Sequence, residues 1–181
     1  MKRWTRTGAL VFGCAFLMAL PSAASANVYL ELPGIPGEST ATGFENQIEL
    51  SSFQLGVGRN AAAKGPSFSE VSVTKQLDKS SPQLMLRTAN GTTIPTAKVR
   101  FTTTGAEKVD VYLRYCFTGV RITNFTQSSG GDERPSESIS FSYATIVQSY
   151  TQGSETGGAG TVFDEGWDVM RNLALGTACD N

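Results

Sequence analysis

The chain has 181 residues, with 15 basic and 16 acidic side chains and no histidine. This near-neutral balance argues against a nucleic-acid-binding protein, which presents a basic surface. The absence of histidine excludes histidine-based triads, cysteine–histidine dyads and histidine-containing zinc sites. The length suits one well-packed domain.

The first 26 residues have the features of a secretory signal peptide. Three basic residues precede an apolar run over residues 8–20, and small residues follow up to Ala26. The alternative is a membrane anchor, but the run is shorter than the ~20 residues that span a bilayer. We therefore predict cleavage between Ala26 and Asn27, a mature domain of residues 27–181, and no stable membrane insertion after cleavage.

Cleavage would change both the charge and the number of cysteines. It leaves 12 basic and 16 acidic side chains and removes Cys14, so that Cys116 and Cys179 remain. An even number of cysteines in an oxidising compartment favours a disulfide between them. The alternative is two separate thiols.

The mature chain begins with short strands and turn-rich links. Residues 27–32 and 48–55 are predicted strands, with Pro and Gly residues between them at 33–39. The glycine-rich segment Gly56–Pro66 lacks the spacing of a phosphate-binding loop, and no helix follows it. We interpret it as a long connection between two antiparallel strands, and a loop of this length typically has an interaction role or is disordered.

A strand, a turn and a short helix follow. The strand is predicted over residues 67–77 from its alternating apolar side chains. We expect Ser81 to cap the helix, Pro82 to occupy its first position, and Asn90 and Gly91 to end it in a left-handed conformation. This segment contains no candidate catalytic residue.

Two further strands are predicted over residues 94–103 and 108–117, joined by a hairpin turn. The second alternates clearly, and Tyr112, Arg114 and Cys116 fall on its more polar face. The alternation shifts by one residue at Gly119, which indicates a bulge or bend of the kind that curves sheets into barrels.

Strands over residues 138–146 and 161–173 complete the pattern, with polar loops at 127–136 and 149–160. About seven or eight short strands and one helix are typical of a mostly-β sandwich or barrel.

No arrangement of residues predicts catalysis. The acidic pairs Asp132–Glu133 and Asp164–Glu165 are sequence neighbours that point apart, whereas glycosidase carboxylates face each other across a cleft. No GxSxG elbow or EF-hand spacing is present. The residues alone therefore predict no enzyme, no cofactor and no metal site, but an exported binding or assembly module.

Four ordered blocks carry a family resemblance: residues 28–39, 65–85, 136–146 and 166–172. Through them the chain resembles the haemolysin-coregulated proteins (Hcp), which form the inner tube of bacterial type VI secretion systems. The resemblance implies a compact β-barrel of two packed sheets with one flanking short helix and an extended loop. It also implies homohexameric rings that stack into a conduit and projectile for effectors, driven by other proteins of the system such as sheath and tip proteins.

The resemblance also implies roles for particular residues. The loop that reaches the neighbouring ring corresponds here to Gly56–Pro66, and its candidate stacking residues are Gly56, Val57, Gly58, Arg59, Asn60 and Lys64. Tyr112 and Arg114 are candidates for the face that contacts a neighbouring subunit.

The signal peptide departs from the family, whose typical members assemble in the cytoplasm without one. The alternative is therefore an exported Hcp-like protein that acts in the periplasm or outside the cell, as a binding module or as an assembly subunit unrelated to a contractile tube. Cytoplasmic tube assembly would require that the signal is not used.

Overall fold

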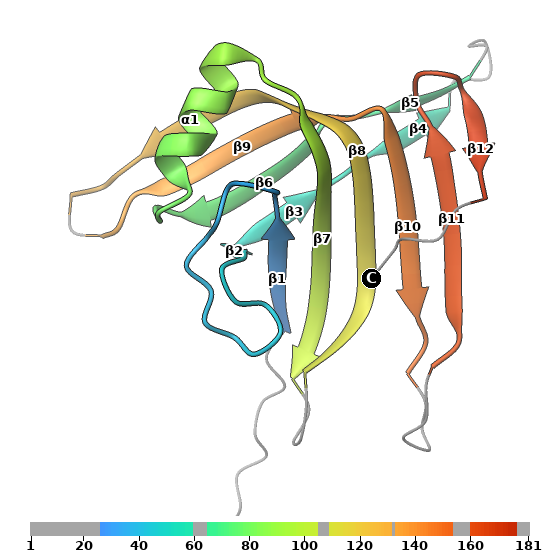
Figure 1. Ribbon diagram of the computed structural model, residues 1–181, viewed down its shortest axis with the longest axis horizontal. Coiled ribbons are helices and arrows are strands. Elements are labelled where there is room, and N and C mark those ends of the chain that lie inside the picture. Colours follow the sequence, from blue (N-terminus) through green and yellow to red (C-terminus); the bar gives the residue numbers. More distant parts are fainter. Residues whose placement is uncertain (1–25, 60–64, 105–108, 132, 154–159, 177–181) are drawn as a thin grey trace, which may run out of the picture.

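The computed structural model describes residues 26–59, 65–104, 109–131, 133–153 and 160–176 as a mostly-β domain with one short helix (Figure 1). The elements are β1 Ala26–Glu31, β2 Ile48–Leu50, β3 Ser52–Gln54, β4 Val57–Arg59, β5 Pro66–Phe68, β6 Val71–Gln76, α1 Ser81–Asn90, β7 Ile94–Thr104, β8 Val109–Ser128, β9 Ser136–Ser142, β10 Thr145–Thr151, β11 Val162–Asp168 and β12 Leu173–Leu175. Within these ranges no helix is long and apolar enough to cross a membrane.

The strands form two packed layers that share β8. One layer has the order β12-β11-β10-β8-β7-β1-β2, and the other runs β3-β6-β9-β8. All of these pairs are antiparallel. β2 and β3 follow each other in the chain but pair with different neighbours, so the pairing does not close into a full cylinder. The predicted barrel of two sheets with a flanking helix is confirmed in this open form.

β8 passes from one layer to the other at Gly119. Residues up to Val120 pair with β7, and residues from Arg121 onward pair with β9. Gly119 has φ 61°, and a Cβ placed on it would lie 2.9 Å from the Cβ of Ala144. The bend predicted at this glycine is therefore confirmed, because a side chain would meet both backbone strain and a close neighbour.

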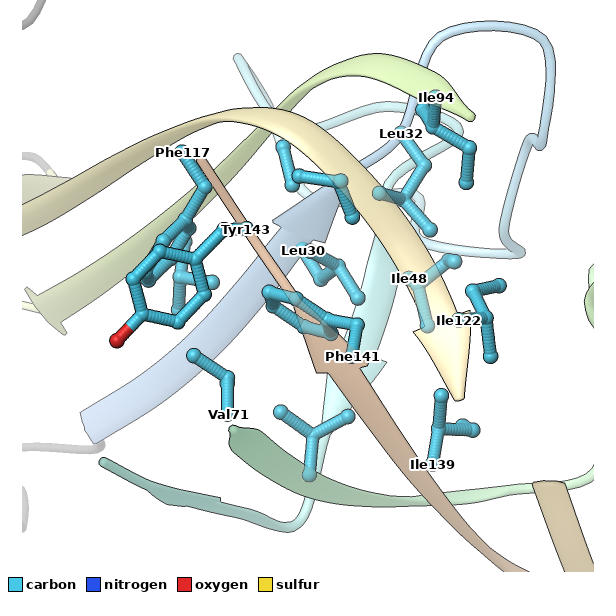
Figure 2. Close-up of a cluster of buried hydrophobic side chains, with 14 of the residues drawn as sticks. Leu30, Leu32, Ile48, Val71, Ile94, Phe117, Ile122, Ile139, Phe141 and Tyr143 are labelled. Atoms are coloured by element: carbon cyan, nitrogen blue, oxygen red, sulfur yellow. The ribbon is translucent and has the colours of Figure 1, made fainter. Parts of the chain in front are cut away.

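The core lies between the two layers (Figure 2). Phe117 from β8 and Phe141 from β9 are almost completely buried, and their rings meet edge to face with centroids 5.4 Å apart. Leu84 is the apolar residue of α1 that is fully buried, so the helix covers the core through one side chain. The core cluster also includes Leu30, Leu32, Ile48, Val71, Ile94, Ile122, Ile139 and Tyr143.

The start of α1 differs from the prediction by one residue. Ser80 is the N-cap and Pro82 the second helical residue, because the side chain of Ser81 is engaged elsewhere. Its Oγ accepts a hydrogen bond from the Asp78 N–H (3.1 Å) and donates one to Glu137 Oε2 (2.8 Å). The predicted end is confirmed: Gly91 is left-handed, with φ 63°.

Four predicted strands are each divided in two. Residues 48–55 form β2 and β3, 67–77 form β5 and β6, 138–146 form β9 and β10, and 161–173 form β11 and β12. In the opposite sense, β8 continues to Ser128, beyond the predicted end at residue 117. The divided strands change pairing partners at their breaks, and apolar alternation does not reveal such a change. The predicted hairpin turn between β7 and β8 lies largely outside the described residues.

Candidate functional site

The predicted stacking loop is in part a two-stranded ribbon, β4–β5, which we call the arm. Val57 pairs with Phe68, and Arg59 pairs with Pro66. The segment predicted as a connection between two antiparallel strands thus itself contributes residues 57–59 and 66 to a pair of strands, which backbone hydrogen bonds order. Val57 is 60% exposed. Asn60 and Lys64 lie outside the described residues.

The base of the arm is fixed to the body of the domain. Gly56 N–H donates to Ser69 Oγ (2.8 Å), and Ser69 N–H donates to the Gly56 carbonyl (2.9 Å). The Tyr143 hydroxyl donates to the Ser69 carbonyl (3.1 Å), and burial raises the pKa of this hydroxyl to about 12. Phe68 stacks on Trp167 of β11, with ring centroids 6.4 Å apart. The arm therefore leaves the domain in a defined direction.

The two candidate subunit-contact residues have different surroundings. Arg114 lies between Arg100 on β7 and Ser149 on β10, and Arg100 forms an ion pair with Glu31 (2.7 Å). The pairing of β7 with β8 shifts beside Tyr112, whose ring lies 6.4 Å from that of Phe101. Arg114 is thus the register neighbour of a second arginine, Arg100. The ring of Tyr112 instead lies near that of Phe101, which packs against the core.

The sequence did not predict a row of two exposed aromatic side chains and one half-buried leucine. Leu113, Tyr150 and Phe163 are register partners on β8, β10 and β11, so they lie on one face of the sheet. Tyr150 is 44% and Phe163 55% exposed. Val162 precedes Phe163 on β11 and so faces the other side of the sheet. Tyr150 falls within residues 149–160, which the sequence predicts as a loop, and no local signal marks it as part of a strand. We call Leu113, Tyr150 and Phe163 the β10–β11 patch.

The remaining candidates concern the cysteines and the cleavage site. Cys116 is disulfide-bonded and pairs in register with Lys98 and Val147. Cys179 lies outside the described residues, so its pairing with Cys116 stays a prediction. Ala26 and Asn27 are the first two residues of β1, and residues 1–25 are not described. Across the described residues, no group of three or more histidine, cysteine or acidic side chains could hold a metal ion.

Comparison with known proteins gives a consistent result. The family model described as "Type VI secretion system effector, Hcp" matches residues 29–150. Protein hcp1 of Pseudomonas aeruginosa is 29% identical over 109 residues, which cover 58% of this chain and 65% of that protein. The match thus spans slightly less than two thirds of this relative.

Solved structures extend the likeness to most of the domain. The structure of a type six secretion system protein has a TM-score of 0.76 and 27% identity, over 83% of this chain and 100% of that chain. Hcp1 from Salmonella typhimurium has a TM-score of 0.70 and 25% identity, over 83% and 99%. A type VI secretion system effector from Yersinia pestis has a TM-score of 0.67 and 25% identity, over 78% and 99%. The chain belongs to the Hcp family of type VI secretion system proteins.

Proposed function

We propose that this protein is a structural subunit of a type VI secretion tube, in which homohexameric rings stack into a conduit and projectile for effectors. The match of the Hcp family model to residues 29–150 carries this proposal. The structural likeness over the full length of solved Hcp chains supports it. The comparisons do not favour the alternative of an exported binding module unrelated to a contractile tube.

The β10–β11 patch supports a lateral contact between subunits. A row of aromatic and aliphatic side chains on an exposed sheet face is typical of a protein–protein interface. The patch lies on the side of the sheet that ends in β11 and β12, whereas the opposite edge of the same sheet is β2. Two different surfaces of this kind suit a heterologous contact, which closes into a ring when the rotation allows. We propose that Tyr112 and Arg114 also contact a neighbouring subunit, with Arg114 on the face of β8 opposite Leu113.

The arm supports contact between rings. Its base is held by hydrogen bonds and by the stacked rings of Phe68 and Trp167, while Val57 at its start is exposed. An ordered ribbon loses less conformational entropy on binding than a mobile loop does. We therefore propose that Gly56 to Arg59, together with Asn60 and Lys64, contact the next ring.

Partners and export are finer parts of the proposal. Effectors would travel in the lumen of the tube, and sheath and tip proteins would drive and carry it. For an exported form, which would not join a cytoplasmic tube, we propose that residues 1–26 are a leader, that residues 27–181 are the mature domain and that Cys116 is bonded to Cys179. Mass spectrometry of non-reduced peptides tests this pairing, and free alkylatable thiols at both cysteines would contradict it.

Electron microscopy of the purified protein tests the assembly. We expect hexameric rings, and stacked rings at high protein concentration. Val57→Asp should reduce stacking while rings persist, because it places a charge on the arm. The control is Leu86→Asp on α1, whose side chain is similarly exposed at 57%. Single subunits at every concentration would contradict the proposal, and equal loss of stacking in both variants would contradict the role of the arm.

A further inference from the structure

The peptide bond at which we expect the leader to be removed lies inside the folded domain. Ala26 and Asn27, on its two sides, are the first residues of β1. They pair in register with Thr103 and Thr102 of β7. The hydroxyl of Thr102, a fully buried residue, donates a hydrogen bond to the Asn27 carbonyl (3.2 Å). The bond is therefore part of a paired strand, whereas proteases cut most readily at free termini and loop tips.

The next residues hold this strand more firmly. β1 lies between β7 and β2 (Figure 1). Val28 pairs with Phe101 on one side and with Leu50 on the other. Tyr29 is 3% exposed, and its ring stacks on that of Phe44 with the centroids 4.5 Å apart. β1 can thus leave the sheet only if backbone pairing on both sides and buried contacts are lost together.

A protease must bind more of the chain than the bond that it cuts. Its cleft takes up several extended residues on each side, so Val28 and Tyr29 would have to leave the sheet together with Ala26 and Asn27. Fraying of Ala26 and Asn27 alone is not enough, because the pairing with β2 begins at Val28. The rate of cleavage then follows the population of an opened state, which is small for an interior strand.

We propose that folding and removal of the leader exclude each other in this protein: β1 protects the Ala26–Asn27 bond, so that a subunit that folds first keeps residues 1–26. Cleavage adds water across this bond and leaves a carboxylate on Ala26 and an amine on Asn27. A signal peptidase would catalyse it only on a chain whose β1 is unpaired. The inference rests on the leader proposed above and goes beyond it, because the order of two events decides between a leader-bearing subunit and an exported one.

Incubation of the purified full-length chain with a bacterial signal peptidase tests the proposal. The matched control carries a flexible Gly/Ser linker of about eight residues between Ala26 and Asn27. This linker keeps the Ala-Ser-Ala sequence of residues 24–26 but moves the bond out of β1. Circular dichroism should show that both chains are folded. We expect the unchanged chain to be cut at least about a hundredfold more slowly than the control, because its bond is reached only in the opened state.

Two substitutions test the protection without moving the bond. Thr102→Val removes the hydrogen bond to Asn27 and should speed cleavage about threefold. Phe117→Ala removes a fully buried ring from the core and should speed cleavage at least about tenfold, because the domain opens more often. Leu86→Ala is the control, since its side chain is exposed on α1, and it should leave the rate unchanged.

Equal rates for the unchanged chain and the linker control would overturn the proposal, and so would equal effects of Phe117→Ala and Leu86→Ala. A linker control that is not cut would also overturn it, because the leader on which it rests would then be no substrate. The tube proposal fails separately. Its test is the mass of the assembly in solution, and a hexamer formed by the full-length chain would support it whichever way the cleavage assay comes out.

Discussion

The two ends of the domain along its long axis are built in opposite ways (Figure 1). At the α1 end, charged side chains are buried and paired, as in the contact of Lys75 with Glu137. At the end that carries the arm and β11, apolar side chains such as Val57 and Phe163 are exposed. The first end holds a buried ion pair within one chain, whereas the second exposes aromatic side chains in a row on one face of the sheet. This difference separates residues that maintain the fold from residues that support assembly.

The largest expected effect comes from the core. Phe117→Ala should lower the free energy of unfolding by about 4 kcal/mol, because it removes a fully buried ring and leaves a cavity. Phe163→Ala is the matched control on the exposed patch and should change that free energy by less than about 1 kcal/mol. Chemical denaturation at low protein concentration measures both. Similar losses in the two variants would contradict the distinction between the two ends.

Loss of the buried ion pair should have the second-largest effect on the free energy of unfolding. Lys75→Met should lower the free energy of unfolding by about 3 kcal/mol, because Glu137 and Asp78 would keep buried negative charge without a cation. Lys79→Met removes an exposed lysine next to Asp78 and should cost less than about 1 kcal/mol. Denaturation curves at neutral pH provide the comparison. If Lys79→Met lowered the free energy of unfolding and Lys75→Met did not, the buried ion pair would not stabilise the α1 end.

A change at the bend in β8 should lower the free energy of unfolding less than the changes to the core and to the buried ion pair. Gly119→Ala should cost about 2 kcal/mol, because alanine at φ 61° is strained and its Cβ would crowd Ala144. Gly130→Ala is the control, since a Cβ there has no neighbour within 4 Å. Thermal unfolding monitored by circular dichroism would detect the difference. If Gly119→Ala were as stable as the control, the bend would not depend on this glycine.

The smallest effect concerns pH at the base of the arm. Burial raises the pKa of Tyr143 from about 10 to about 12, so the folded state favours the neutral hydroxyl. Its contribution to stability is complete below pH 10 and is lost as the pH rises towards 12. Tyr143→Phe should make the loss of stability across this range shallower, although it also removes the hydrogen bond to Ser69. An unchanged slope in alkaline denaturation curves would contradict this assignment.

The sequence predicted the fold class and the helix because those features have local signals. Gly91 at the end of α1 and Gly119 at the bend in β8 were both found from the sequence, since each position needs a glycine backbone. The division of residues 48–55 into β2 and β3 was not predicted. Alternation shows which side chains share a face, but it does not show which strand each half will pair with.

The candidate surfaces were predictable only in part. The arm was located from its glycines, but its pairing was not, because Val57 and Phe68 are eleven residues apart across a polar segment. Tyr150 and Phe163 were missed because they come together through long-range register, and nothing local marks them as exposed. The pairing of Lys75 with Glu137 joins residues 62 positions apart and has no local signal.

Sedimentation of the purified protein over a range of concentrations tests the central claim most directly. The account predicts a closed hexamer for the unchanged chain, and a shift towards single subunits for Phe163→Asp in the β10–β11 patch. The same substitution at Leu86 on α1 should leave the hexamer intact. A single-subunit mass for the unchanged chain at all concentrations would contradict the claim that this protein is a ring-forming subunit.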